Sequence, residues 1–160
     1  RLVSESGHSF DVAKQGYVSL APGVGLKHKG DSSEMVSARE TFLSLGHFAP
    51  FVEAVTGAVQ DALDANELPE TAEPMLLEVG AGTGYYLAHT LDSIAEARGV
   101  GLDISPHAAK HLAKCHPRVG AVVADVWERL PLQDDSIDAV SVVFAPRNPA
   151  EFQRILRPGG

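Results

Sequence analysis

The sequence contains one cysteine, Cys115, among its 160 residues. A single thiol excludes an intramolecular disulfide framework and any zinc site built from several thiolates within this stretch. Long hydrophobic runs are also missing, because no apolar segment approaches the roughly 20 residues that a membrane-spanning helix needs. The N-terminus lacks the basic and apolar regions of a signal peptide. Together these absences predict a soluble, cytoplasmic protein with no membrane partner.

Positive charge is scarce as well. The chain has 13 lysine and arginine residues against 21 aspartate and glutamate residues, which gives a formal net charge of −8. This balance argues against a protein that binds nucleic acid through bulk electrostatic attraction. The acidity lies after Pro50, whereas the first third is nearly neutral. Lys27, His28 and Lys29 would be the footprint of an anionic partner there; the alternative is that they lie in a solvated loop.

The first part of the chain is expected to hold short strands and two helices. Weak alternation over residues 10–20 predicts the strands. Asp31 and Glu34 resemble a capping box that begins a helix, and Gly46 ends it. Its apolar residues recur at helical spacing: Met35, Ala38, Phe42 and Leu45. A second helix begins near Pro50, and its apolar face consists of Val52, Val55, Val59 and Leu63.

From residue 75 onward, short apolar runs alternate with helical stretches. Strands are predicted at 75–79, 100–103, 121–125 and 137–144. Helices are predicted around 87–94 and from Ser105, a good N-cap, to Cys115. Such alternation is typical of a parallel sheet with covering helices. The carboxyl ends of its strands then meet at one edge, where ligands bind.

A glycine-rich loop lies at that edge. Residues 78–84 read EVGAGTG, directly after a strand and at the start of a helix. The dinucleotide fingerprint G-x-G-x-x-G does not fit, because Tyr85 or Leu87 occupies its third small position. A G-x-x-x-x-G-K-[ST] sequence for nucleoside triphosphates is also absent. The loop therefore favours a ligand without a pyrophosphate.

These residues resemble the first motif of class I methyltransferases that use S-adenosylmethionine (SAM), acidic-x-G-x-G-x-G. The resemblance implies a Rossmann-like α/β fold and a site that binds SAM and its product S-adenosylhomocysteine. Asp103 would accept the ribose hydroxyls, as its position about 20 residues after the loop also suggests. Asp125 would contact the adenine amine; the alternative is that it caps the following turn. The full implied set is Glu78, Gly80, Gly82, Gly84, Tyr86, Asp103, Asp125 and Val126.

Further segments resemble the bacterial 23S ribosomal RNA guanine-N1 methyltransferases. They are residues 7–11, 13–18, 30–31, 35, 38–39, 46–48 with Pro50, and 144–148. The last of these, FAPRN, resembles the Gram-positive branch associated with resistance to tylosin-type macrolides. The resemblance covers nearly the whole chain and implies methyl transfer to N1 of a guanine in 23S ribosomal RNA. Two alternatives stay open: a small-molecule methyltransferase and a noncatalytic, methyltransferase-like binding module.

The sequence departs from that family at both ends. Members begin with a zinc module of three cysteines and a histidine, but Ser4 stands at the third cysteine position and only His8 remains. We therefore expect no zinc here and interpret His8 as an ordinary, partly buried histidine. Because Gly160 falls where a fifth strand is expected, the fold is predicted to be C-terminally incomplete. The expected division is 1–30, a remnant of the N-terminal module; 31–74, a helical linker; and 75–160, the SAM-binding domain.

The catalytic residues are less well marked than the cofactor site. Pro146 and Arg147 follow the predicted fourth strand, where a backbone carbonyl and a guanidinium would position the target base; a plain surface arginine is the alternative. Tyr85, Tyr86 and Trp127 would stack on adenine or on the target base, or fill the core. We expect RNA contact to come mainly from the first third, or from a homodimer that combines two such modules.

Overall fold

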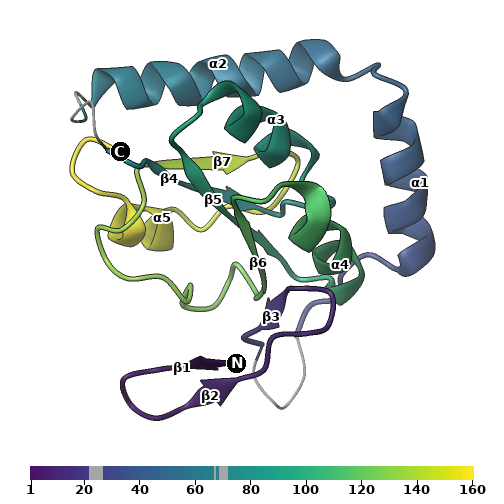
Figure 1. The fold of residues 1–160 in the computed structure, drawn as a ribbon, viewed down its shortest axis with the longest axis vertical. Coiled ribbons are helices and arrows are strands. Elements are labelled where there is room, and N and C mark those ends of the chain that lie inside the picture. Colours follow the sequence, from purple (N-terminus) through teal and green to yellow (C-terminus); the bar gives the residue numbers. More distant parts are fainter. Residues whose placement is uncertain (22–26, 67, 69–71) are drawn as a thin grey trace.

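A computed structural model describes residues 1–21, 27–66, 68 and 72–160. Its centre is a five-stranded parallel sheet in the order β3-β6-β5-β4-β7 (Figure 1). The strands are β3 (Val18–Ser19), β6 (Val119–Val123), β5 (Arg98–Asp103), β4 (Met75–Val79) and β7 (Ala139–Val142). A separate antiparallel pair, β1 (Leu2–Val3) and β2 (Ser9–Phe10), precedes the sheet. The predicted Rossmann-like α/β fold is confirmed.

Helices cover both faces of this sheet. The helices α2 (Ala49–Ala65), α3 (Tyr85–Ser93) and α4 (Pro106–Cys115) lie on one face, and α5 (Pro149–Ile155) lies on the other (Figure 1). Helix α1 (Ser33–Ser44) stands beside the sheet. No single helix in the described part of the chain is long and apolar enough to cross a membrane; α1 and α2 reach that length and composition only when counted together across a 90° bend.

Strand β4 shows why the sequence forms a sheet that is buried on both sides. Leu77 and Val79 point into the core that α5 covers, whereas Leu76 belongs to the core under α2 and α3. Successive side chains of a strand alternate between its faces, so a central parallel strand, covered on both sides, is mostly apolar. Glu78 lies on the same face as Leu76, and this placement points its carboxyl toward α3.

The structure corrects two details of the first predicted helix. Its N-cap is Ser32, whose Oγ accepts the N–H of Met35 at 3.3 Å, rather than Asp31. Its buried residues are Val36 and Leu43, whereas Met35, Phe42 and Leu45 of the predicted face are about half exposed. Helical spacing alone is consistent with both the predicted and the observed buried residues, because α1 carries apolar residues around most of its circumference.

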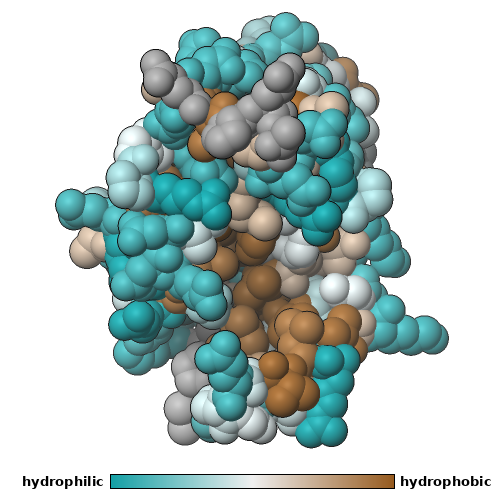
Figure 2. Space-filling model, turned by 60° about the vertical axis from the view of Figure 1, so that its left-hand side comes forward, coloured by the Kyte–Doolittle hydropathy of each residue, from teal (hydrophilic) through white to brown (hydrophobic). Residues whose placement is uncertain are grey.

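Hydrophobic residues are exposed in several other places. Figure 2 shows one face of the molecule, on which hydrophobic side chains gather in a hollow between hydrophilic flanks. Phe51 is 55% exposed, Trp127 53% and Phe144 80%. Clustered exposed apolar residues mark interaction or ligand sites more often than single ones do. Trp127 and Phe144 line the cavity described below, whereas Phe51 packs beside Phe48 outside that lining.

Two predicted strands end earlier than expected, and a short strand of the first third has a partner that was not predicted. The third predicted strand ends at Val123 instead of residue 125, and the fourth ends at Val142 instead of residue 144. Strand β3 pairs with β6 through Val18 and Val122, so the first third supplies an edge strand of the main sheet. A two-residue strand has too little pattern to reveal its partner. The division of the chain at residue 30 stays a prediction.

Replacing Arg157 with alanine is expected to destabilise the fold by about 1–3 kcal/mol, because it removes the charged partner of a buried carboxylate. Nη1 of Arg157 donates to both carboxyl oxygens of Asp138 at 2.6 and 2.7 Å, and Asp138 is 1% exposed. The measurement is the urea midpoint of the full-length protein at unchanged m-value. Arg129→Ala is the control, because its 3.7 Å pair with Asp134 is exposed and such pairs contribute little. Equal midpoints for the two variants would contradict this prediction.

Candidate functional site

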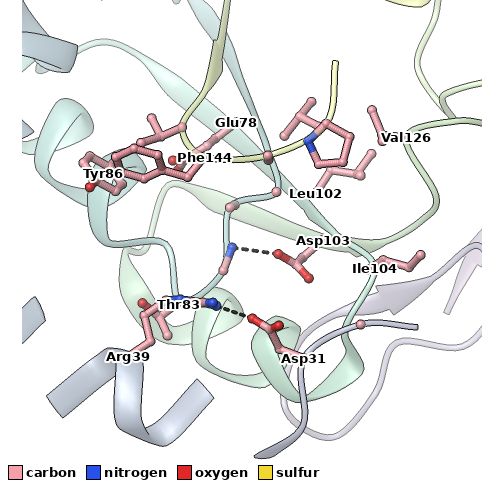
Figure 3. Close-up of a pocket in the computed structure, with 18 of the residues that line it drawn as sticks. Asp31, Arg39, Glu78, Thr83, Tyr86, Leu102, Asp103, Ile104, Val126 and Phe144 are labelled. Carbon is pink, nitrogen blue, oxygen red and sulfur yellow. Dashed lines mark hydrogen bonds and ion pairs between the residues drawn. The ribbon is translucent and has the colours of Figure 1, made fainter. Parts of the chain in front are cut away.

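A cavity of about 530 Å³ opens at the carboxyl ends of β4, β5, β6 and β7. Its lining includes the glycine loop after β4, residues 28–31 and part of helix α1, and Figure 3 shows Arg39 and Asp31 below the loop. Glu78 and Tyr86 lie toward one end of the close-up, and Asp103 lies toward the other. The cavity brings together seven of the eight cofactor residues expected from the sequence: Glu78, Gly80, Gly82, Tyr86, Asp103, Asp125 and Val126.

The three glycines of the loop all have a positive φ, at 66° for Gly80, 56° for Gly82 and 81° for Gly84. Most residues avoid this region, and glycine does not. A Cβ at Gly80 would overlap Ala145, and one at Gly84 would overlap Cys115. A Cβ at Gly82 would have 3.8 Å to its nearest neighbour, Nη1 of Arg39. The absence of a side chain at Gly80 and Gly84 therefore permits close packing of the chain, whereas at Gly82 it leaves open space in the cavity. Gly84 does not line the cavity.

Asp103, the last residue of β5, connects the glycine loop to helix α4. Its Oδ2 accepts the N–H of Gly82 at 2.8 Å, and its Oδ1 accepts the N–H of Ser105 at 2.8 Å. Burial raises the pKa of this carboxyl, although the two backbone hydrogen bonds act in the opposite direction. The carboxylate therefore sits at the strand end and fixes the loop beside it.

Glu78 is a buried carboxyl in the lining of the cavity. It is 1% exposed, and its Oε2 accepts the N–H of Leu87 in the first turn of α3 at 3.0 Å. Burial raises its pKa to about 8, with one backbone hydrogen bond opposing the shift. At neutral pH the folded protein thus binds a proton here that the unfolded chain releases.

The stability of the protein is expected to fall as the pH rises through the window set by Glu78. The pKa of this carboxyl is about 8 in the folded state against an ordinary 4.5. Between these values the unfolded state binds fewer protons, so the free energy of unfolding decreases with pH. Glu78→Gln cannot ionise and should flatten that decrease in urea titrations from pH 5 to 8. An unchanged slope in the variant would show that other groups cause it.

Asp125 follows β6 and makes two contacts. Its Oδ1 accepts the N–H of Trp127 at 3.0 Å, so it does cap the following turn. Its Oδ2 lies 2.8 Å from Nδ1 of His28. Burial tends to raise the pKa of this carboxyl, but the hydrogen bonds from His28 and Trp127 outweigh burial and lower it. Asp125 is therefore ionised at neutral pH and borders the cavity from the β6 side.

Residues 27–31 are held against the sheet edge, which sequence reasoning did not predict. Oγ of Ser105 donates to the backbone oxygen of Asp31 at 2.7 Å, and a Cβ at Gly30 would lie 2.8 Å from Cα of Ser105. Lys27 pairs with Glu128 at 2.5 Å. Lys27, His28 and Lys29 are all exposed, as the solvated-loop alternative expects, although His28 also contacts Asp125. The only local signal was the pair Gly30-Asp31 just before α1, and a local sequence pattern does not show which distant residue such a pair contacts.

The remaining candidates fall into two groups. Pro146 lines the cavity, whereas Arg147 is exposed and lies outside its lining.

The interpretation of His8 as partly buried is wrong, because His8 is exposed and its Nδ1 forms a hydrogen bond with Oγ of Ser6 at 3.0 Å. Ser4 bonds Ser6 in the same turn. Hydroxyls and one imidazole do not fit a structural zinc ion, which takes thiolate and imidazole ligands.

A glycine loop between β4 and α3, with carboxylates after the next two strands of a parallel sheet, defines a class I SAM-dependent methyltransferase domain. The family model described as "Methyltransferase domain" matches residues 76–160, and the chain belongs to this family. The solved structure of the sugar N-methyltransferase KedS8 from Streptoalloteichus sp. has the same fold. Its TM-score is 0.57 at 21% identity, over 87% of this chain and 55% of that one.

Curated relatives extend the similarity over the first third. The 23S rRNA (guanine(748)-N(1))-methyltransferase of Streptomyces fradiae is 44% identical over 99% of this chain. A Micromonospora griseorubida protein with a similar name is 46% identical over 97% of it. The resemblance to this methyltransferase group is thereby confirmed. The chain spans about half of each relative, 55% in both cases.

Proposed function

We propose that the cavity binds SAM in an extended orientation along the carboxyl edge of the sheet. Asp103 would accept the ribose hydroxyls, Asp125 would contact the adenine amine, and the loop from Gly80 to Gly84 would face the methionine moiety. The geometry supports this order, because the two carboxylates follow neighbouring strands and the loop lies beyond them. Gly82 supports it most directly, since its missing side chain leaves the open space that a ligand backbone needs.

We further propose that the whole protein transfers the methyl group to N1 of a guanine in 23S ribosomal RNA. The observation that carries this is the similarity to the Streptomyces fradiae enzyme over 99% of the chain, including residues that a small-molecule methyltransferase would not need. Such an enzyme would work in the cytoplasm, where its substrate is. A homodimer would supply the RNA-binding surface that one acidic chain, with a net charge of −8, supplies weakly.

An aromatic rim at the mouth of the cavity supports a flat acceptor. Phe42, Phe48 and Phe144 line the opening, from α1, the α1–α2 turn and the segment after β7. The ring centroid of Phe48 lies 5.6 Å from that of Phe42 and 6.4 Å from that of Phe144. A base must leave its stack to be methylated, and exposed rings stabilise extruded bases by stacking. The rim therefore favours a nucleobase over a flexible aliphatic acceptor.

The chemistry is an in-line displacement. SAM would supply an electrophilic methyl group on a sulfonium, and transfer of that methyl to guanine N1 would leave S-adenosylhomocysteine as the second product. The chain's residues contribute by holding the two reactants in line, which supplies much of the rate in such reactions. The N1 proton must also leave, and a carboxylate or histidine that acts as general base would accept it. Pro146 beside the cavity and Arg147 next to it are the candidates for holding the base edge, with the guanidinium near guanine O6.

Transfer of labelled methyl from SAM tests the proposal. The full-length protein is incubated with 23S ribosomal RNA lacking the modification, and with a panel of small hydroxyl and amine acceptors. We expect label in RNA alone, released on digestion as N1-methylguanosine. Label in a small acceptor would support the small-molecule alternative. No transfer by a protein that binds S-adenosylhomocysteine would support the noncatalytic one.

A further inference from the structure

Arg39 is a charged group in the cavity to which the assignments above give no ligand. It lies on α1, its guanidinium pairs with Asp31, and its side chain is 43% exposed. Nη1 is the atom nearest to the space beside Gly82, 3.8 Å from where a Cβ would stand. Figure 3 shows Arg39 and Asp31 side by side under the glycine loop, near Thr83. Arg39 therefore covers the end of the cavity that the loop forms.

The charges around the cavity make this position distinctive. Its lining includes the carboxyl groups of Asp31, Glu78, Asp103 and Asp125. Among the described residues that line it, lysine and arginine are represented by Lys29 and Arg39. Lys29 adjoins His28, which contacts Asp125 at the β6 side. Arg39 is thus the guanidinium at the glycine-loop end of a largely acidic cavity.

A SAM molecule presents three charges at that end: a sulfonium, an ammonium and a carboxylate. Acidic surroundings suit the two cations, but the carboxylate needs a cation of its own. A guanidinium has five N–H donors in a fixed fork, and its pairing with Asp31 uses Nη1. Arginine forks bind carboxylates in a bidentate manner with good geometry.

Resting on the proposed cofactor site, we propose that Arg39 binds the carboxylate of the methionine moiety of SAM and of its product, with Asp31 as the residue that positions it. Asp31 is itself fixed, because its backbone oxygen accepts the hydroxyl of Ser105 at the start of α4. The first third then contributes directly to cofactor recognition by linking α1 to the loop. A purely structural Arg39–Asp31 pair would hold α1 in place and would not distinguish between ligands.

The test compares two ligands that differ in this group. S-adenosylhomocysteine carries the amino-acid carboxylate, whereas 5′-methylthioadenosine lacks the whole amino-acid moiety. Both are titrated calorimetrically into the full-length protein and its Arg39→Ala and Arg39→Lys variants. Arg98→Ala is the matched control, because it removes the same charge at the start of β5, where Arg98 pairs with Glu73 at 3.0 Å away from the cavity.

We expect Arg39→Ala to weaken S-adenosylhomocysteine binding about 10- to 100-fold, the usual effect of losing a charge-assisted hydrogen-bonded partner. Methylthioadenosine binding should stay within experimental scatter, Arg39→Lys should be intermediate, and Arg98→Ala should match the unchanged protein. Equal weakening of both ligands, or of neither, would overturn the role of Arg39. A folded, unsubstituted protein that binds neither ligand would instead overturn the proposed cofactor site.

Discussion

Replacing Gly82 with aspartate should abolish S-adenosylhomocysteine binding while leaving the protein folded. The position has a φ of 56°, a conformation that aspartate adopts more readily than most residues, and the nearest atom to a Cβ there is 3.8 Å away. The new carboxylate would lie in the cavity near Arg39 and beside Asp103, whose Oδ2 already accepts the Gly82 N–H at 2.8 Å. It would pair with Arg39 and repel the ligand carboxylate. Like charges placed together cost several kcal/mol, so affinity should fall about 100-fold or more.

The matched control is Gly57→Asp. Gly57 lies in α2, is exposed, and would meet no atom within 4 Å of a new Cβ. Calorimetric titration of both full-length variants, with far-ultraviolet circular dichroism to verify the fold, separates loss of the site from loss of structure. Gly82→Asp binding with unchanged affinity would show that the ligand does not lie against the glycine loop.

The sequence predicted the central part of this fold well because its signals were local. Strand β4 begins and ends where its apolar run does, and Ser105 and Cys115 bound α4 as expected. The loop residues and Asp103 were found because a turn between strand and helix restricts residue type to glycine, and a strand end fixes where the next side chain points. Such constraints act within about 25 residues and leave a pattern in the sequence.

Contacts between distant segments left no such pattern. His28 meets Asp125, and Arg39 covers Gly82, although each pair is separated by a long stretch of chain. Both contacts depend on how α1 and the segment before it fold back over the sheet, which neither periodicity nor capping signals encode. The aromatic rim was hidden for the same reason. Helical spacing grouped Phe42 with Met35, Ala38 and Leu45, and only the fold shows that Phe42 borders the cavity.

Phe144→Ala should reduce methyl transfer to RNA about 10- to 100-fold with cofactor binding unchanged, because base–aromatic stacking contributes about 1–3 kcal/mol per base. Phe144 is 80% exposed and has a φ of 55°, so its ring adds little to the core. A bulky residue at positive φ costs of order 1–3 kcal/mol and persists where the surroundings require it. At Phe144 the neighbour Ala145 packs against Gly80, which holds the segment in place and turns the ring toward the opening.

Phe51→Ala is the control that separates stacking at the rim from general loss of aromatic surface. Phe51 is 55% exposed and its ring centroid lies 5.2 Å from Phe48, but it does not line the cavity. Single-turnover transfer to 23S ribosomal RNA, with calorimetric titration of S-adenosylhomocysteine alongside, measures both properties on the full-length variants. Phe144→Ala should slow transfer while Phe51→Ala leaves it nearly unchanged. Equal slowing by both would mean that the aromatic cluster supports the shape of α1 and α2, and full activity in both would place the acceptor base elsewhere.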